Sequence, residues 1–243
     1  MIRVSASTIK SFITCPRQVW YRINAPELAE KTTPQIIGSI VHEAIERFSS
    51  DFDSAIEFVA VESSRNGLDS LSEERAVRFV KNFFNIKDEL NVDFNKGEFE
   101  KQFEVKISNI AFIGRFDFVD LSSKTVIDWK TSIYEPVNLD FDPQFIVYWL
   151  AANRLFGRKN DDINVFYVSL SHEKAIKYKP NKQVVDSFLH DVVPSFIRSL
   201  KSDLLPPLGI YNYQFPCAHC QFRLHCHKTF IRSDSNELPV KFN

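Results

Sequence analysis

Residues 114–131 read GRFDFVDLSSKTVIDWKT, and this stretch decides the fold that the sequence predicts. Branched and aromatic side chains dominate both of its ends, which is typical of buried strands, and a Ser-Ser pair makes a tight connection between them. We therefore expect two adjacent strands, 110–121 and 124–131, joined as an antiparallel hairpin. Three charged residues within this hairpin, Asp117, Asp128 and Lys130, lie inside the apolar strands.

The charged side chains of the predicted hairpin can form one polar site. Alternate residues of a strand share a face, so Asp128 and Lys130 project together, and the short turn brings Asp117 near them. Two carboxylates can bind a hard divalent cation, which activates water and stabilises charge on a phosphate, while the lysine neutralises or orients it. The alternative, a surface hairpin with ordinary charges, leaves unexplained why so apolar a strand holds an Asp and a Lys on one face.

Hydrophobic periodicity predicts helices and further strands on both sides of the hairpin. Strands flanked by helices indicate a single α/β domain, 1–243, with a mixed sheet and a helical insertion over about 50–95. Two independent domains are the alternative, but no linker composition separates the halves. The expected helices cover 7–12 with Ser7 as N-cap, 36–48, 53–65, 73–90, 143–156 and 182–200 with a kink at Pro194. The other expected strands are 98–107, 163–170 and 173–179.

Composition excludes several classes of protein. The 243 residues are 44% hydrophobic and 25% charged, which argues against disorder, and 30 Lys and Arg against 31 Asp and Glu exclude a generally basic nucleic-acid coat protein. The chain has no G-x-x-x-x-G-K-[ST] motif and so encodes no ATP-driven motor. With no apolar run near the ~20 residues that span a bilayer and no signal peptide, we expect a cytoplasmic protein without a membrane partner.

Four cysteines suggest a second metal site. Cys217, Cys220 and Cys226 have the spacing C-x2-C-x5-C, and Cys15 is the remaining one. Inside a cell such a set is more typical of metal binding than of disulfides, and four thiolates suit either a tetrahedral zinc ion or an iron–sulfur cluster. The histidines that could replace a thiolate at zinc are His219, His225 and His227.

The order Asp117, then Asp128-Trp129-Lys130, resembles the core motif of the PD-(D/E)XK nuclease superfamily. The resemblance implies a restriction-endonuclease-like mixed sheet. Upstream, Gly38-x-x-x-His42 is similar to the helical element of the RecB-type branch, and downstream Gln144-x-x-x-Tyr148 matches its Q-x-x-x-Y element. For this chain the resemblance implies magnesium or manganese bound by His42, Asp117 and Asp128. The catalytic residues that it implies are Asp117, Asp128, Lys130, Gln144 and Tyr148.

The arrangement of the cysteines resembles that of iron–sulfur RecB-type nucleases, namely the AddB nuclease domain and the CRISPR-associated adaptation exonucleases. The resemblance covers Ser5 to Lys228 apart from the insertion. It implies a 4Fe-4S cluster that joins the two chain ends. The implied ligands are Cys15, Cys217, Cys220 and Cys226.

The resemblance implies a metal-dependent DNA exonuclease acting on ends or single strands. Its role would lie in repair, recombination, viral replication or CRISPR adaptation, with a helicase or integrase-type protein as a separate partner. A non-cleaving nucleic-acid-binding or assembly module of the same fold is the alternative. The intact Asp/Asp/Lys set argues against that alternative, because a binding module needs no such group.

Three weaker candidates remain. Glu104 precedes the hairpin and is either an additional acidic site residue or a solvent-facing side chain on an edge strand. Basic residues could track a DNA backbone, with an aromatic ring for base stacking, or could simply be a solvated surface. The first basic segment consists of Lys174, Lys177, Tyr178 and Lys179, and the second of Arg154, Arg158 and Lys159.

Overall fold

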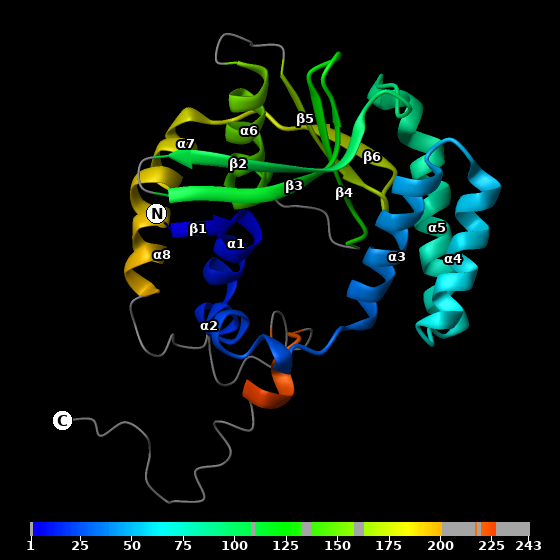
Figure 1. Ribbon diagram of the computed structural model, residues 1–243, viewed down its shortest axis with the longest axis horizontal. Coiled ribbons are helices and arrows are strands. Elements are labelled where there is room, and N and C mark those ends of the chain that lie inside the picture. Colours follow the sequence, from blue (N-terminus) through cyan, green and yellow to red (C-terminus); the bar gives the residue numbers. More distant parts are fainter. Residues whose placement is uncertain are drawn as a thin grey trace, which may run out of the picture. The chain divides into compact units, whose positions relative to one another are not determined.

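The computed structural model describes most of the chain, and contacts divide it into two compact units, each built from two separate stretches of sequence (Figure 1). The described residues are 2–107, 110–132, 138–157, 163–200, 217 and 220–226. The first unit comprises 1–10 and 33–194, and the second comprises 11–32 and 195–243. Among the described residues, no helix combines the length and the apolar character needed to cross a membrane.

The first unit contains a six-stranded mixed sheet in the order β1-β3-β4-β5-β6, with β2 paired to β3. The β1–β3 and β4–β5 pairs are parallel and the other pairs are antiparallel, so the predicted mixed sheet is confirmed. The strands are β1 Ile2–Ser5, β2 Glu98–Ile107, β3 Ile110–Asp120, β4 Thr125–Lys130, β5 Asn164–Ser169 and β6 Lys174–Lys177.

Strand β3 has two different neighbours along one of its edges. On its other edge β2 follows it over nearly its whole length. On the divided edge, β1 pairs with residues 110–113 and β4 pairs with residues 118–120. Residues 114–117 therefore pair with neither β1 nor β4, and we call this gap in the ladder the β3 fork. Backbone groups at the fork need partners other than strands.

Helices of the first unit flank its sheet, and most of them match the sequence prediction, whereas α2 of the second unit was not predicted. The helices are α1 Ala6–Thr14, α2 Pro16–Asn24, α3 Thr33–Phe48, α4 Phe52–Arg65, α5 Ser70–Ile86, α6 Pro143–Phe156, α7 Lys182–Ser187 and α8 Val193–Ser199. Short 3-10 turns occupy Pro26–Leu28, Lys87–Leu90 and Leu139–Phe141. Helix α6 has the bounds that the sequence predicts, because Pro143 suits a first helical turn and Gly157 ends the helix with a φ of 91°.

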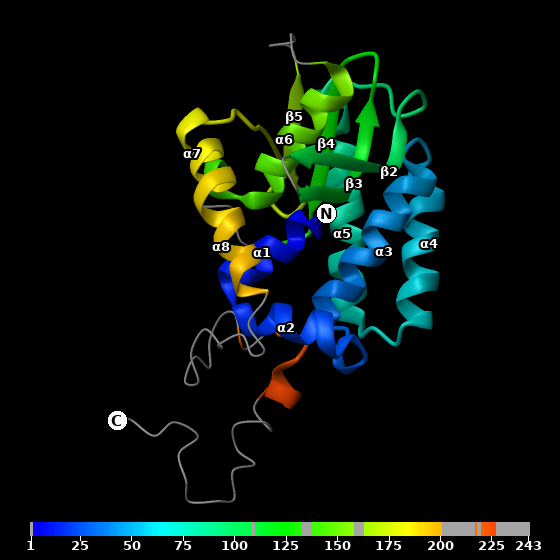
Figure 2. The same cartoon turned by 60° about the vertical axis from the view of Figure 1, so that its left-hand side comes forward.

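The predicted helices of the insertion are confirmed as α4 and α5, which lie beside α3 (Figures 1 and 2). The side chains of Asp51 and Asp69 cap their first turns by accepting backbone N–H bonds. The three helices share one apolar cluster that includes Phe118, Trp129 and Val168 of the sheet. The insertion thus covers the aromatic side of the hairpin and keeps water from it.

Three local features differ from the sequence prediction. Strand β1 was not expected, because four residues are too few to show a period. The cap of α1 is Ser5 rather than Ser7, since Ser5 Oγ accepts the Thr8 N–H at 3.1 Å. The helix predicted over 182–200 is interrupted by a π turn at Phe188–Val192, directly before Pro194, whose ring and missing N–H prevent a regular turn.

The second unit has a small aromatic core of its own. Tyr21 of α2 stacks on Phe222 with ring centroids 5.2 Å apart, and Cys220 and Cys226 pack against this pair. The Glu30 N–H donates to the Gln221 carbonyl at 3.1 Å. These contacts join the residues around α2 to those of 220–226, although about 200 positions separate them in the sequence.

The hairpin turn after β3 depends on one buried carboxylate, that of Asp120, which is 2% exposed. It accepts the Ser122 N–H at 2.8 Å and hydroxyl bonds from Ser122 and Ser123 at 2.6 and 2.9 Å. Although burial opposes its charge, these bonds lower the pKa of Asp120 below the usual value.

We predict that Asp120→Asn lowers the free energy of unfolding by about 1–3 kcal/mol near neutral pH, because an amide cannot accept all these bonds. A depressed pKa contributes stability above the unfolded value that is lost on acidification, so the difference from wild type should shrink as the pH falls through it. Urea unfolding at several pH values measures this. Exposed Asp88→Asn is the matched control, and an equal loss in both variants would contradict the assignment.

Candidate active site

Helix α3 brings His42 to the β3 fork. Gly38 lies one turn before His42, and a Cβ at Gly38 would stand only 3.3 Å from Thr131 Oγ1 just after β4. The absence of a side chain therefore allows the close approach of the helix to the strand. His42 Nδ1 lies 3.6 Å from Asp117 Oδ1. This explains why a glycine and a histidine four residues apart belong to one motif.

Two site side chains replace the backbone partners that are missing at the fork. Asp117 Oδ2 accepts the Trp129 N–H of β4 at 2.9 Å. The Tyr148 hydroxyl donates to the Arg115 carbonyl of β3 at 2.7 Å. The divergence of β1 and β4 therefore both frees these backbone groups and fixes two functional side chains against them.

Asp128 lies beside Asp117 and is fully buried. Lys130 Nζ is 3.0 Å from Asp128 Oδ1 and 2.7 Å from Oδ2, and Gln144 Nε2 donates to Oδ1 at 2.8 Å. Gln144 Nε2 also lies 3.0 Å from the Tyr148 hydroxyl, one turn further along α6. The structure thus brings together Asp117, Asp128, Lys130, Gln144 and Tyr148, all of which the sequence suggested.

The start of α6 fixes the position of Gln144. Asp142 is the N-cap and accepts the Gln144 N–H at 2.9 Å. Its second oxygen forms an ion pair with Lys10 Nζ at 2.7 Å. Helix α6 therefore begins at a defined residue, which aims the amide at Asp128.

Burial and the charges of neighbouring groups shift the pKa values of the ionisable side chains in the site. Burial and the charge of Asp128 raise the pKa of Asp117 well above its usual value. Burial also raises the pKa of Asp128, against the attraction of Lys130. Burial opposes the charge of Lys130, but both carboxylates outweigh it and raise the pKa of this lysine, which stays protonated. Burial and Lys130 lower the pKa of His42 to about 3, so its neutral ring can offer a lone pair.

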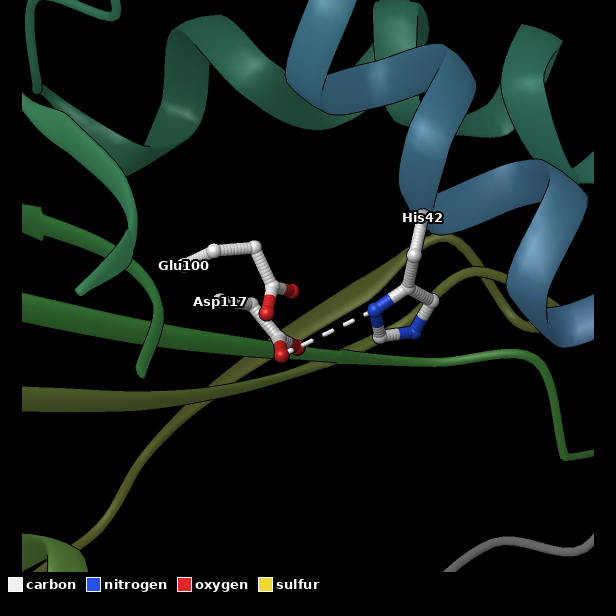
Figure 3. Close-up of side chains that lie close together, drawn as sticks. All are labelled: His42, Glu100 and Asp117. Carbon is white, nitrogen blue, oxygen red and sulfur yellow. Dashed lines mark ion pairs between the residues drawn. The ribbon is translucent and has the colours of Figure 1, made fainter. Parts of the chain in front are cut away.

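Glu100 of β2 is a site residue that the sequence prediction missed. His42, Glu100 and Asp117 offer ligand atoms that all lie within 4.8 Å of one another (Figure 3). Glu100 faces Asp117 in the β2–β3 register, and its φ of 49° interrupts an otherwise regular strand. Glu104, the acidic residue that the sequence singled out, instead pairs with Arg3 at 2.7 Å. The signal that could have identified Glu100 is the antiparallel pairing of the predicted strands 98–107 and 110–121, which places position 100 opposite position 117.

The residues present fit a divalent cation. An imidazole and two carboxylates are suitable ligands for magnesium or manganese. Asp128 Oδ2 is buried and, among the described residues, accepts no hydrogen bond despite its ion pair with Lys130. A buried carboxylate oxygen with a free lone pair is a suitable ligand for a cation.

One residue of the basic segment around β6 is wrongly predicted to stack on bases. Tyr178 is 3% exposed, and its ring packs against Phe145 with centroids 5.9 Å apart. The chain turns inward after β6, which hides this ring. Lys174, Lys177 and Lys179 are exposed, as is Arg154 at the end of α6. Arg158 and Lys159 lie outside the described residues.

All four cysteines belong to the second unit and are free thiols. Burial raises the pKa values of Cys217, Cys220 and Cys226, and the charge of Cys15 acts on each of the three in the same direction. The four thiols therefore lie in one compact unit, close enough for Cys15 to influence the other three electrostatically. Of the three histidines near them, His225 is described, whereas His219 and His227 lie outside the described residues.

A mixed sheet with a histidine, carboxylates and a lysine around one cation site defines a metal-dependent nuclease. Residues 3–227 match the PD-(D/E)XK nuclease superfamily, and the chain belongs to this superfamily. Its sheet flanked by helices is consistent with the restriction-endonuclease-like fold. The crystal structure of SSO0001 is similar over 93% of this chain and 86% of that one, with 15% identity and a TM-score of 0.41. A search of curated proteins returned no match.

We predict that metal affinity decreases on acidification from a higher pH than for ordinary carboxylates. The raised pKa of Asp117 means that protons compete with the cation, so binding should also release protons. Manganese titration calorimetry from about pH 8 to 5, in two buffers of different ionisation enthalpy, measures both effects. A flat affinity with no proton release would contradict the assignment. Asp117→Asn should reduce both effects, and Glu100 and Asp128, whose pKa values are also raised, account for what remains.

Proposed function

We propose that the protein is a magnesium- or manganese-dependent deoxyribonuclease, and specifically an exonuclease acting on DNA ends or single strands. The observation that carries the proposal is the ion pair of buried Asp128 with partly buried Lys130, beside the cation group of His42, Glu100 and Asp117. The proposed roles are DNA repair, recombination, viral replication or CRISPR adaptation, with a helicase or integrase-type partner. These roles rest on the resemblance of the motifs to the RecB-type branch.

The residues divide the chemistry among them. A bound divalent cation supplies an activated water and stabilises charge on the phosphate. His42, Glu100 and Asp117 would hold it, with Asp128 Oδ2 as a further oxygen. Lys130 stabilises the negative charge that develops on the phosphoryl oxygens, because its neighbouring carboxylates keep it protonated.

The remaining site residues preserve this geometry. Gln144 holds Asp128 Oδ1, and Asp128 in turn holds the ammonium of Lys130. The Tyr148 hydroxyl links Gln144 to the backbone of Arg115. This chain of hydrogen bonds limits the movement of Lys130 before substrate arrives, which reduces reorganisation during the reaction.

A non-cleaving nucleic-acid-binding or assembly module is the second candidate. Burial of a charged pair costs free energy that a binding surface has no reason to incur. The strained backbone of Glu100 has a similar cost, of about 1–3 kcal/mol. Both observations favour a cleaving enzyme.

We predict that Lys130→Met lowers the DNA cleavage rate at fixed magnesium by at least about 100-fold while the protein stays folded. Single- and double-stranded substrates labelled at either end measure rate, polarity and strand preference together. Lys81→Met, an exposed lysine on α5, is the matched control. Cleavage by Lys130→Met at the wild-type rate would remove the hairpin from the catalytic centre. If the wild-type protein binds DNA but does not cleave it, the second candidate is favoured.

We further propose that Cys15, Cys217, Cys220 and Cys226 hold a 4Fe-4S cluster, as in the RecB-type nucleases that the cysteine spacing resembles. Four free thiols in one unit support this. A tetrahedral zinc ion held by the same thiolates is the alternative, because four sulfur ligands suit either metal centre.

We predict that anaerobically purified protein is brown and contains about four irons per chain. Cys226→Ser should lower the iron content and the melting temperature, because the cluster ties together the two stretches of the second unit. Iron and zinc analysis and a melting curve are the measurements. Stoichiometric zinc without iron after anaerobic reconstitution would contradict the cluster.

A further inference from the structure

A groove leads away from the cation group along one face of β1, β2 and β3. It has a volume of about 770 Å³ and begins at His42, Glu100 and Asp117. Beyond them it is lined by Gln102 and Glu104 of β2, Arg115 of β3, and Arg3 and Ser5 of β1. The groove is thus an open continuation of the candidate active site, in which these polar side chains lie beside Phe103, Ile113 and Gly114.

Strand alternation explains why this face is polar. Arg115 and Asp117 are two apart on β3 and share the face, and the ladder places Gln102 opposite Arg115. The intervening Phe116 points to the other side, where its ring packs against Phe103 and Tyr148. The aromatic side builds the core, and the polar side extends about 13 Å from Asp117 to Ile113.

The groove contains two arginines, both paired with carboxylates. Arg115 Nη1 lies 3.0 Å from a Glu100 carboxylate oxygen, and Arg3 pairs with Glu104. Both guanidiniums are therefore engaged by acidic side chains of the groove, in a lining that also contains the Asp117 carboxylate. An arginine held by a carboxylate is less available to a phosphate than a free one.

We propose that Arg115 is a phosphate-binding residue that Glu100 keeps ion-paired until a cation binds. The cation that occupies the active site takes the Glu100 carboxylate and thereby releases Arg115 to bind the backbone of a nucleic-acid strand lying in the groove. The proposal deepens the nuclease function and rests on it. It makes substrate binding, and not only cleavage, depend on the cation.

The position of Glu100 allows this exchange. Its carboxylate lies both within the cation group and in contact with Arg115, so a divalent cation and the guanidinium compete for one acid. The left-handed backbone of Glu100 holds it at this junction. The side chain of Arg115 is 62% exposed, so solvent leaves it room to change partner. One divalent cation adds two positive charges to the lining, which favours the binding of phosphate.

Binding and cleavage can be measured separately in the Lys130→Met background. The probe is a fluorescently labelled single-stranded oligonucleotide, titrated by anisotropy with calcium or with EDTA. Calcium should strengthen binding of the parent at least about tenfold, and Arg115→Met should remove most of this gain while changing the EDTA value little. For Arg115→Met, the slope of log affinity against log salt concentration should be smaller than that of the parent by about one, and only in calcium. Arg65→Met, an ion-paired and exposed arginine on α4, is the matched control.

Two further readouts distinguish competition from a structural role. Without DNA, Arg115→Met should bind manganese several-fold more tightly, measured by electron paramagnetic resonance, because a competing cation is gone. Glu100→Gln should bind manganese more weakly yet bind the oligonucleotide several-fold more tightly in EDTA, because Arg115 is already free. Effects of opposite sign are not expected from mere unfolding.

Three results would overturn the proposal. An equal loss of DNA binding by Arg115→Met in calcium and in EDTA would make the contact permanent. Weaker manganese binding by Arg115→Met would exclude the competition. A Glu100→Gln variant that binds DNA no more tightly than the parent in EDTA would exclude it as well. If the wild type cleaves DNA in these cases, only the inference fails. A wild type that neither binds nor cleaves DNA would overturn the proposed function as well.

Discussion

The divided edge of β3 is the constraint on which the rest of the site depends. Because β1 and β4 pair with different halves of this strand, its central residues lack a strand partner on one side. Asp117 and Tyr148 bond to the backbone of Trp129 and Arg115 there, so the free backbone groups are satisfied by functional side chains. The site therefore forms part of the hydrogen bonding of the sheet.

The β3 fork also places two carboxylates close together in a buried environment, where their charges repel each other. Burial and the charge of Asp128 disfavour the ionised form of Asp117, and Lys130 and the Trp129 N–H partly offset this. Removing the Asp117 carboxylate therefore relieves repulsion but leaves the Trp129 N–H without this partner. Removing Asp128 leaves Lys130 without its closest counter-ion. The apolar cluster shared by α3, α4 and α5 stabilises the fold and so offsets the unfavourable free energy of the charges at the site.

The sequence prediction was most accurate where a local rule decided the outcome. The bounds of α6 followed from a proline and a glycine, and Gln144 and Tyr148 met because residues four apart share a helix face. It failed where a residue's surroundings came from distant parts of the chain. Tyr178 looked like a stacking ring among lysines, but its burial against Phe145 of α6 has no local signature.

The sequence by itself determined the superfamily, the mixed sheet and the order of the Asp, Asp and Lys, because strand alternation and motif spacing are properties of short segments. Tertiary structure alone decided that Glu100 joins His42 and Asp117, and that Glu104 pairs with Arg3 instead. The physical reason is that the two acids are four residues apart on one strand face and look equivalent in sequence. Only the register with β3 and the left-handed turn at Glu100 distinguish them.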